Sequence, residues 1–453
     1  MDLKPISQFW ERFNQKTLFP LEEAVGPLTS ALEGLIRTWE FVRVEEFVVK
    51  PWWSPLGRPP KDRAAVARAF VAKAYFNIPT TDALIDRLQV DSALRRLCGF
   101  ERRGDVPSES TFSRAFAEFA ASGVAQRAHE ALVKFIYGDE IVGHISRDST
   151  AIDAREKPAK KAKALVSEPA AAKKKGRPKK GEPASAPEPT RLDKQRAPDA
   201  ALPSMLSAIP TACDIGAKRN SKGFTETWQG YKLHLDVADT GLPVSAILTS
   251  ASVHDSQVAI PLMLTTQERT GVVFYELMDS AYDAPQIHEV SRRLGRIPII
   301  DCNPRSNKEK QSTKADMALL KTLDLPLSEQ TRFSERTTVE RANARVKDEF
   351  GGRTLRVRGH AKALTHLMFG VCVLAADVML RLTVTSRVRH ARFLQTRFPH
   401  GENFVRLLPI LPIFQATLTC AHGGLPAITL ARESLQHKRL STDFGNFVLQ
   451  EAQ

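Results

Sequence analysis

The chain has 453 residues, of which 65 are Lys or Arg and 51 are Asp or Glu, so its formal net charge is +14. This surplus makes a polyanion such as DNA the first partner to consider, and the length allows two or three domains. Five cysteines without a CxxC pair argue against a disulfide framework and a zinc site. Without a Walker loop or a Rossmann glycine run, no nucleotide cofactor is expected.

No signal-peptide pattern opens the chain. The most apolar run, residues 367–376, ends at Asp377, so we expect a buried core helix and no membrane partner.

The first 137 residues are predicted to be helical. An alanine-rich helix is expected at 63–75, and Thr81-Asp82 offers a cap for the next one. Ser108 and Gly123 bracket a further helix over 109–121, which carries a stripe of phenylalanines. Arginines on the polar sides favour a DNA reader of the helix-turn-helix type, namely Arg95, Arg96, Arg102, Arg103 and Arg114. A plain helical bundle with a charged surface remains the alternative.

Beyond residue 140 the apolar residues alternate or form short runs, which is typical of strands. Strands are predicted at 141–146, 231–237, 244–249, 272–278 and 297–300. A turn at Asp239-Thr240-Gly241 joins the second and third strands into a hairpin. Helices are predicted at 255–268, around Ile287 to Leu294, and around Glu340. This order predicts a mixed α/β sheet with helices on its faces.

A segment of different composition separates the first strand from the hairpin. Residues 156–200 contain 13 Lys or Arg, 6 Asp or Glu and seven prolines, so we expect a disordered basic insertion that extends to about residue 205. Its centre, Gly176-Arg177-Pro178, is flanked by lysines and looks like an AT-hook. Arg177 and Lys179 would then bind in the narrow minor groove of DNA. A charged tether without sequence preference is the alternative.

Three carboxylates stand in chain order: Asp148 after the first strand, Asp279 after a buried strand, and Glu340 on a helix. Hard oxygen ligands of this kind suit Mg²⁺ or Mn²⁺, and two such ions would clamp both oxygens of a phosphoryl displacement. Asp153 could replace Asp148 if the first strand ended later. Other acidic residues are interpreted as surface or turn carboxylates, namely Asp214, Asp236 and Asp239. We interpret Asp255 as a helix cap, and His254 as a local hydrogen bonder, rather than as an acid/base pair.

Glu340 lies in a spaced motif with Phe333, Arg336 and Lys347. At about 100° per residue, these four side chains fall within roughly 60° on an α-helix. A carboxylate between two cations and a ring suits a metal ion held against a phosphate backbone. The alternative is a solvated ion pair between Arg336 and Glu340, although Arg before Glu is the weaker orientation. An apolar seam beside the motif predicts packing on a core, through Val339, Val346 and Phe350.

The pattern resembles the DDE transposases of bacterial insertion sequences, in the branch named for its Tyr-Arg-Glu-Lys signature. Over most of residues 55–385 the chain also carries phrases typical of that family, namely Asp148-Ser149-Thr150, 218–221, 228–234, 252–256 and 279–283. The resemblance implies an RNase H-like fold, with Asp148, Asp279 and Glu340 as catalytic metal ligands. It also implies that Arg336 and Lys347 contact DNA near the transposon end. Phe333 replaces the signature tyrosine, which keeps a ring for stacking but removes the hydroxyl.

Three regions follow from this resemblance. Residues 1–137 would bind the element's ends, and residues 138–385 would form the RNase H-like catalytic domain around the insertion. Residues 386–453 stay unassigned. They contain a basic stretch that either binds DNA or faces solvent. The implied function is Mg²⁺- or Mn²⁺-dependent cleavage at the element's ends and strand transfer into target DNA. A homodimer or larger homo-oligomer would act on double-stranded DNA of the bacterial nucleoid, in the cytoplasm. Two alternatives are an inactive DNA-binding derivative and a nuclease that cuts without joining.

Overall fold

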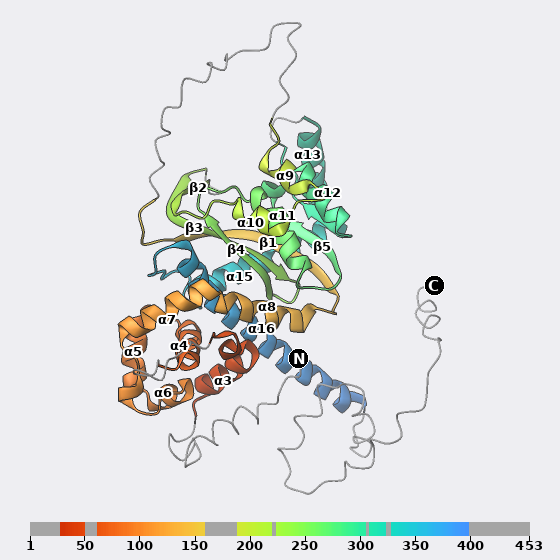
Figure 1. Cartoon of the computed structure of the whole chain (residues 1–453). Coiled ribbons are helices and arrows are strands. Elements are labelled where there is room, and N and C mark those ends of the chain that lie inside the picture. The colour runs from red at the N-terminus through yellow and green to blue at the C-terminus, as the bar shows by residue number, and fades with distance from the viewer. Residues whose placement is uncertain are drawn as a thin grey trace, which may run out of the picture. The chain divides into compact units, whose positions relative to one another are not determined.

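The computed structural model describes residues 28–49, 61–158, 188–219, 223–304, 308–322 and 328–397 (Figure 1). Arg177 and Lys179, like most of the extension 386–453, lie outside these residues. Residues up to Arg387 belong to one compact unit of the chain.

The N-terminal region is helical, as predicted. Its elements are α3 (Ser30–Val42), η1 (Val44–Phe47), α4 (Arg63–Tyr75), α5 (Thr81–Val90), α6 (Ser92–Cys98), η2 (Arg103–Asp105), α7 (Glu109–Ser122) and α8 (Val124–Tyr137). Helix α4 has the predicted bounds. The cap of α5 is Thr80 rather than Thr81, because the Thr80 hydroxyl accepts from the Ala83 amide. Ser108 occupies the N-cap of α7 without a capping hydrogen bond, and Gly123 ends that helix at φ 63°.

The helical region shares its core with the far end of the chain. The ring of Phe70 on α4 packs against Phe112 and Phe116 of α7, and it stacks on Phe369 at 5.8 Å between centroids. Phe369 belongs to α16 (His360–Arg397). Arg95 is only 7% exposed and donates to the carbonyls at the end of α5. The expectation that Arg95 lies on a polar side is therefore wrong.

Six strands form one mixed sheet: β1 (Val142–Asp153), β2 (Asp214–Arg219), β3 (Thr225–Ala238), β4 (Pro243–Ser250), β5 (Val273–Met278) and β6 (Ile297–Ile300). The order is β2-β3-β1-β5-β6, and β4 also pairs with β3. Strands β1, β5 and β6 run parallel, whereas β3 runs antiparallel to β1, β2 and β4. The mixed α/β fold predicted from the element order is confirmed, and it is an RNase H-like fold.

Two features of this region differ from the prediction. Strand β1 continues to Asp153, so Asp148 lies inside the strand and not after it, because pairing with β3 extends past residue 146. Strand β2 was not predicted; it extends the sheet beyond β3.

The basic segment was expected to stay disordered to about residue 205, and this is wrong at its C-terminal end. Helices α9 (Arg191–Arg196) and α10 (Leu202–Ser207) form there. Met205 enters an apolar cluster with Ile260 and Met263, which explains why the end of the segment folds. The predicted centre of the segment lies outside the described residues.

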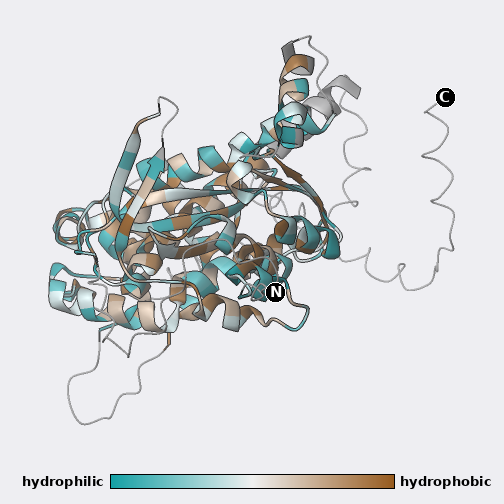
Figure 2. Cartoon of the chain, turned by 90° about the horizontal axis from the view of Figure 1, so that it is seen from above, coloured by the Kyte–Doolittle hydropathy of each residue, from teal (hydrophilic) through white to brown (hydrophobic). Residues whose placement is uncertain are grey.

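Helices cover both faces of the sheet (Figure 1). Helix α15 (Thr337–Asp348) packs on β1 and β3, while α11 (Ser256–Gln267) packs on the opposite face, with α9, α10 and α12 (Pro285–Arg293) beside it. Buried hydrophobic residues lie on each of these layers, for example Leu235 of β3, Ile260 of α11 and Val339 of α15. Hydrophobic and hydrophilic residues alternate along the helices in Figure 2. The remaining elements are η3 (Ser280–Tyr282), α13 (Lys308–Thr322), α14 (Ser328–Phe333) and η4 (Ser334–Arg336).

Within α16, the predicted core helix at residues 367–376 is confirmed by its burial. The span His360–Thr383 is apolar and long enough to cross a membrane, but 72% of its most apolar stretch of 18 residues is buried inside the protein. Such burial is typical of a core helix.

Candidate active site

Asp148 and Asp279 occupy equivalent places on neighbouring parallel strands. Arg147 of β1 pairs with Met278 of β5, and each of these two residues is followed in the chain by one of the two aspartates. Strand β5 ends at Met278, so Asp279 caps η3, and its Oδ1 accepts from the Ala281 amide at 3.0 Å. The sheet register therefore brings the two carboxylates to the same end of the parallel strands.

The two carboxylates are held in an environment that disfavours their charge. Burial raises the pKa of Asp148 to about 6, and the charge of Asp279 acts in the same direction. Burial also raises the pKa of Asp279, with a contribution from the charge of Asp255. Arg336 and Lys218 oppose these effects at both aspartates. Two like charges kept close in a partly buried place make a cation favourable there.

Glu340 lies on α15 with its side chain 49% exposed, and it accepts a hydrogen bond from Arg336 at 2.5 Å. The guanidinium of Arg336 also lies 5.7 Å from the centre of the Phe333 ring. A 3₁₀ turn, Ser334–Arg336, separates Phe333 from α15. The expectation of one continuous helix through all four motif residues is wrong, since a 3₁₀ turn has about three residues per turn.

The ion pair between Arg336 and Glu340, weighed above as an alternative, is thus present. Among the described residues, no three His, Cys, Asp or Glu side chains are grouped closely enough to hold a metal ion. The structure brings Asp148 and Asp279 together and leaves Glu340 with Arg336. Lys347, further along α15, donates to the Thr150 hydroxyl of β1 at 3.2 Å. The predicted apolar seam of α15 is buried, through Val339, Val346 and Phe350.

Sequence reasoning missed Asn343, the residue of α15 that reaches Asp148. Its Nδ2 donates to Asp148 Oδ2 at 3.3 Å, and its Oδ1 is buried without a hydrogen-bond partner in the described part of the chain. Asn343 follows Glu340 by three residues, so helical spacing from Glu340 could have found it. The oxygens of Asp148, Asp279 and Asn343 are hard donors, and this set fits Mg²⁺ or Mn²⁺.

The other face of β1 carries a second polar group. Lys232 Nζ and Ser149 Oγ each donate to Asp255 Oδ1 at 2.9 Å. Asp255 stands at the N-cap of α11, but its side chain makes no capping hydrogen bond, so that part of its interpretation is wrong. His254 does bond locally as predicted, with its Nδ1 2.8 Å from Ser256 Oγ.

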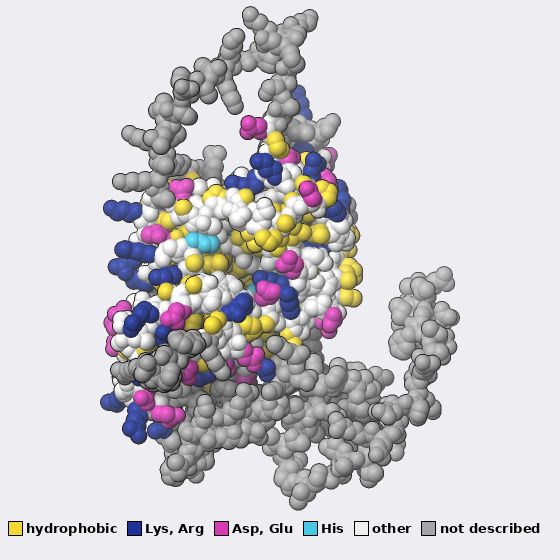
Figure 3. All heavy atoms as spheres, in the orientation of Figure 1, with side chains coloured by type: hydrophobic (Ala, Val, Ile, Leu, Met, Phe, Trp, Pro, Cys, Tyr) yellow, Lys and Arg dark blue, Asp and Glu magenta, His cyan; other side chains and the backbone are white. Residues whose placement is uncertain are grey.

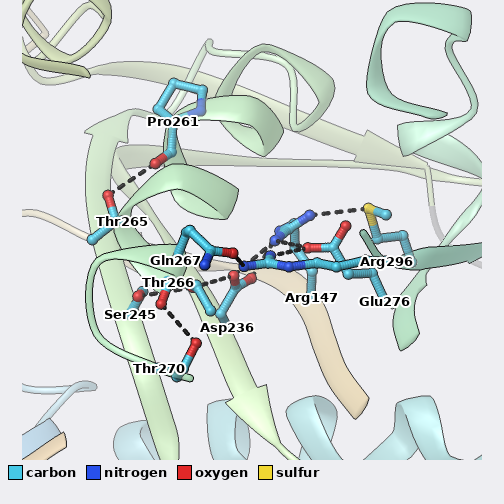
Figure 4. A network of polar contacts seen from close by, with 11 residues as sticks. Arg147, Asp236, Ser245, Pro261, Thr265, Thr266, Gln267, Thr270, Glu276 and Arg296 are labelled. Carbon is cyan, nitrogen blue, oxygen red and sulfur yellow. Dashed lines mark hydrogen bonds and ion pairs between the residues drawn. The ribbon is translucent and has the colours of Figure 1, made fainter. Parts of the chain in front are cut away.

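A buried ionic network lies beside these residues (Figure 4). Arg147 pairs with Asp236 at 2.7 Å and with Glu276 at 3.3 Å, and Arg296 pairs with Glu276 at 2.7 Å. All four side chains have no exposed surface. The interpretation of Asp236 as a surface or turn carboxylate is therefore wrong, because the buried Arg147 needs a counter-charge. Asp239 does belong to the turn, where its Oδ1 accepts from the Thr240 amide.

Asp153, considered as a replacement for Asp148, is exposed at the end of β1. The two residues are separated by an odd number of positions, so their side chains point to opposite faces of the sheet. Lys and Arg side chains gather along the left edge of the view in Figure 3, at the level of β2 and β3. A basic edge of this kind suits a polyanionic substrate.

An RNase H-like sheet with aspartates on adjacent parallel strands, faced by a helix with Arg, Glu and Lys, defines the class of DDE enzymes that act on DNA. Two family models match the chain: a transposase DDE domain over residues 199–375, and a transposase domain (DUF772) over residues 19–118. The chain belongs to the DDE transposases of insertion sequences. The first match contains Asp279 and Glu340 and begins after Asp148. No curated protein and no solved structure matches the chain.

Proposed function

We propose that this transposase cleaves DNA at the ends of its own element and joins them to target DNA, with Mg²⁺ or Mn²⁺ held by Asp148, Asp279 and Glu340. The observation that supports this most is the pairing of Arg147 with Met278, which sets the two aspartates side by side. Burial raises the pKa of both carboxylates, so a bound cation would stabilise their ionised forms.

A pair of divalent cations would stabilise the charge on the scissile phosphate and activate water or a 3′-hydroxyl for attack. The chain itself needs no nucleophile and contributes position and charge. Glu340 would exchange its contact with Arg336 for the site, which its half-exposed side chain allows. Arg336 would then pair with a DNA phosphate, with Lys347 about three helical turns further on. Phe333 offers a ring for packing against a base.

The remaining parts of the proposal concern partners. The N-terminal helices would recognise the terminal repeats, and Arg177 and Lys179 would add contacts to non-specific DNA. A homodimer or larger homo-oligomer would hold both ends of the element, since both must be joined to one target. Such an enzyme would work on nucleoid DNA in the bacterial cytoplasm.

The test is incubation of the full chain with Mg²⁺ and a labelled fragment that carries the element's end. Free 3′-hydroxyls at the boundary, followed by joining to a plasmid, are expected. Asp148→Ala and Asp279→Ala should abolish cleavage and leave end binding intact. Cleavage without joining would indicate a nuclease, and binding without cleavage by the wild type would indicate an inactive DNA-binding derivative.

A further inference from the structure

The residue of α15 in contact with Asp148 is Asn343 and not Glu340. Asn343 is 5% exposed, whereas the side chain of Glu340 is 49% exposed. The Asn343 amide donates from Nδ2 to Asp148 Oδ2 at 3.3 Å across the interface between α15 and β1.

The orientation of this amide follows from the chemistry of its partner. An ionised carboxylate can only accept hydrogen bonds, so the NH₂ group of Asn343 must face Asp148. The amide oxygen is bonded to the same carbon as Nδ2 and therefore lies beside the same carboxylate. That oxygen is buried and has no hydrogen-bond partner among the residues described. Buried acceptors are rarely left unpaired in native proteins, so this oxygen calls for a hydrogen-bond donor or a cation.

We propose that Asn343 belongs to the cation site, where its N–H group orients Asp148 and its carbonyl oxygen supplies a neutral ligand to the cation. This inference rests on the proposed function, because it assumes that Asp148 binds the cation. A carbonyl oxygen adds a hard ligand without adding a third negative charge to a buried group. Asn343 would then supply a ligand from α15 to the cation even while Glu340 is still paired with Arg336.

The test measures Mn²⁺ binding to the full chain without DNA, by electron paramagnetic resonance of free Mn²⁺. Asn343→Leu keeps the branching at Cγ but removes both polar atoms, and it should weaken Mn²⁺ binding by about 10- to 100-fold, as loss of residues that support a metal site does. Asn343→Asp keeps an oxygen ligand but loses the N–H group that orients Asp148, so its Mn²⁺ affinity should lie between those of wild type and Asn343→Leu. Thermal melting of each variant checks that the fold is kept.

The matched control is Thr338→Val, which removes another buried polar group from α15, since Thr338 is 8% exposed. It should leave Mn²⁺ affinity unchanged. The inference is overturned if Asn343→Leu binds Mn²⁺ like Thr338→Val, or if Asn343→Asp is as weak as Asn343→Leu. Asp148→Ala distinguishes the role of Asn343 from the proposed function. If that variant binds Mn²⁺ like wild type, the cation site lies elsewhere, and the assignment of Asp148 as a metal ligand is wrong as well.

Discussion

Arg147 on β1 and Asp236 on β3 face each other across the sheet and form two hydrogen bonds, Nε to Oδ1 at 2.8 Å and Nη2 to Oδ2 at 2.7 Å. Neither side chain has exposed surface, and the same guanidinium reaches Glu276 on β5 (Figure 4). Arg147 thus connects three strands immediately before Asp148. A buried charge is tolerated only when it is paired, so this network depends on every member.

Arg147→Met should lower the free energy of unfolding by about 3 to 5 kcal/mol. It leaves the buried carboxylate of Asp236 without a counter-charge, and it leaves Glu276 with Arg296 as its remaining arginine partner. Urea denaturation of the full chain measures this. The control is Lys134→Ala, which removes an exposed ion pair with Glu130 and should change stability by about 1 kcal/mol or less. If Arg147→Met were as stable as that control, the network would not hold the sheet together.

Asp148→Asn should make the protein more stable while it removes cleavage. The folded pKa of Asp148 is about 6, above its usual value of 3.8, so the ionised carboxylate destabilises the folded state as the pH rises through about 6. In EDTA at pH 8, the variant should gain about 1 to 3 kcal/mol of unfolding free energy, and the gain should shrink as the pH approaches 4. Urea denaturation at both pH values measures it. A loss of stability at pH 8 would contradict this account of the site.

His129 should make stability depend on pH. Its Nε2 lies 2.9 Å from the Pro243 carbonyl, and burial, together with the charge of Arg269, lowers its pKa to about 3. The unfolded chain binds a proton below its usual pKa of 6.5, while the folded chain does not until the pH nears 3. The stability present above pH 6.5 is therefore lost as the pH falls.

His129→Gln keeps a donor for Pro243 but does not titrate. Between pH 7 and pH 4 the unfolding free energy should fall for both proteins. The fall should be about 3 kcal/mol smaller for the variant than for wild type, since each pKa unit corresponds to about 1.4 kcal/mol. Chemical denaturation across this range measures the difference. Some slope should remain from His234, whose pKa burial lowers to about 4. Parallel curves for variant and wild type would show that His129 does not carry this dependence.

Lys347→Ala should weaken binding to DNA that flanks the cleavage site. Loss of one phosphate contact reduces the slope of log affinity against log salt by about one. Titration of labelled DNA at several salt concentrations measures the slope, with Lys134→Ala on α8 as a control for total charge. If both variants have the same slope, Lys347 does not contact a DNA phosphate, and its role is limited to the hydrogen bond with Thr150.

Local patterns in the sequence determined much of the fold. Helix α4 and strand β6 have the bounds that their apolar spacing predicts, and Gly123 ends α7 because glycine adopts the left-handed conformation readily. The chemistry of the family could also be recognised, since the carboxylates and the spaced basic residues are set by the order of residue types. These features depend on neighbours in the chain, which the sequence displays directly.

Only the tertiary structure decided which side chains meet. The sequence predicts a surface or turn carboxylate at Asp236, yet strand pairing places this residue against Arg147 in the interior. Asn343 carries no charge and matches no motif, but packing of α15 on β1 brings it to Asp148. Phe333 and Glu340 share a face only if the helix is continuous, and the turn Ser334–Arg336 interrupts it. Each outcome depends on contacts between segments distant in the chain or on a local change of helix type, and residue spacing alone does not encode either.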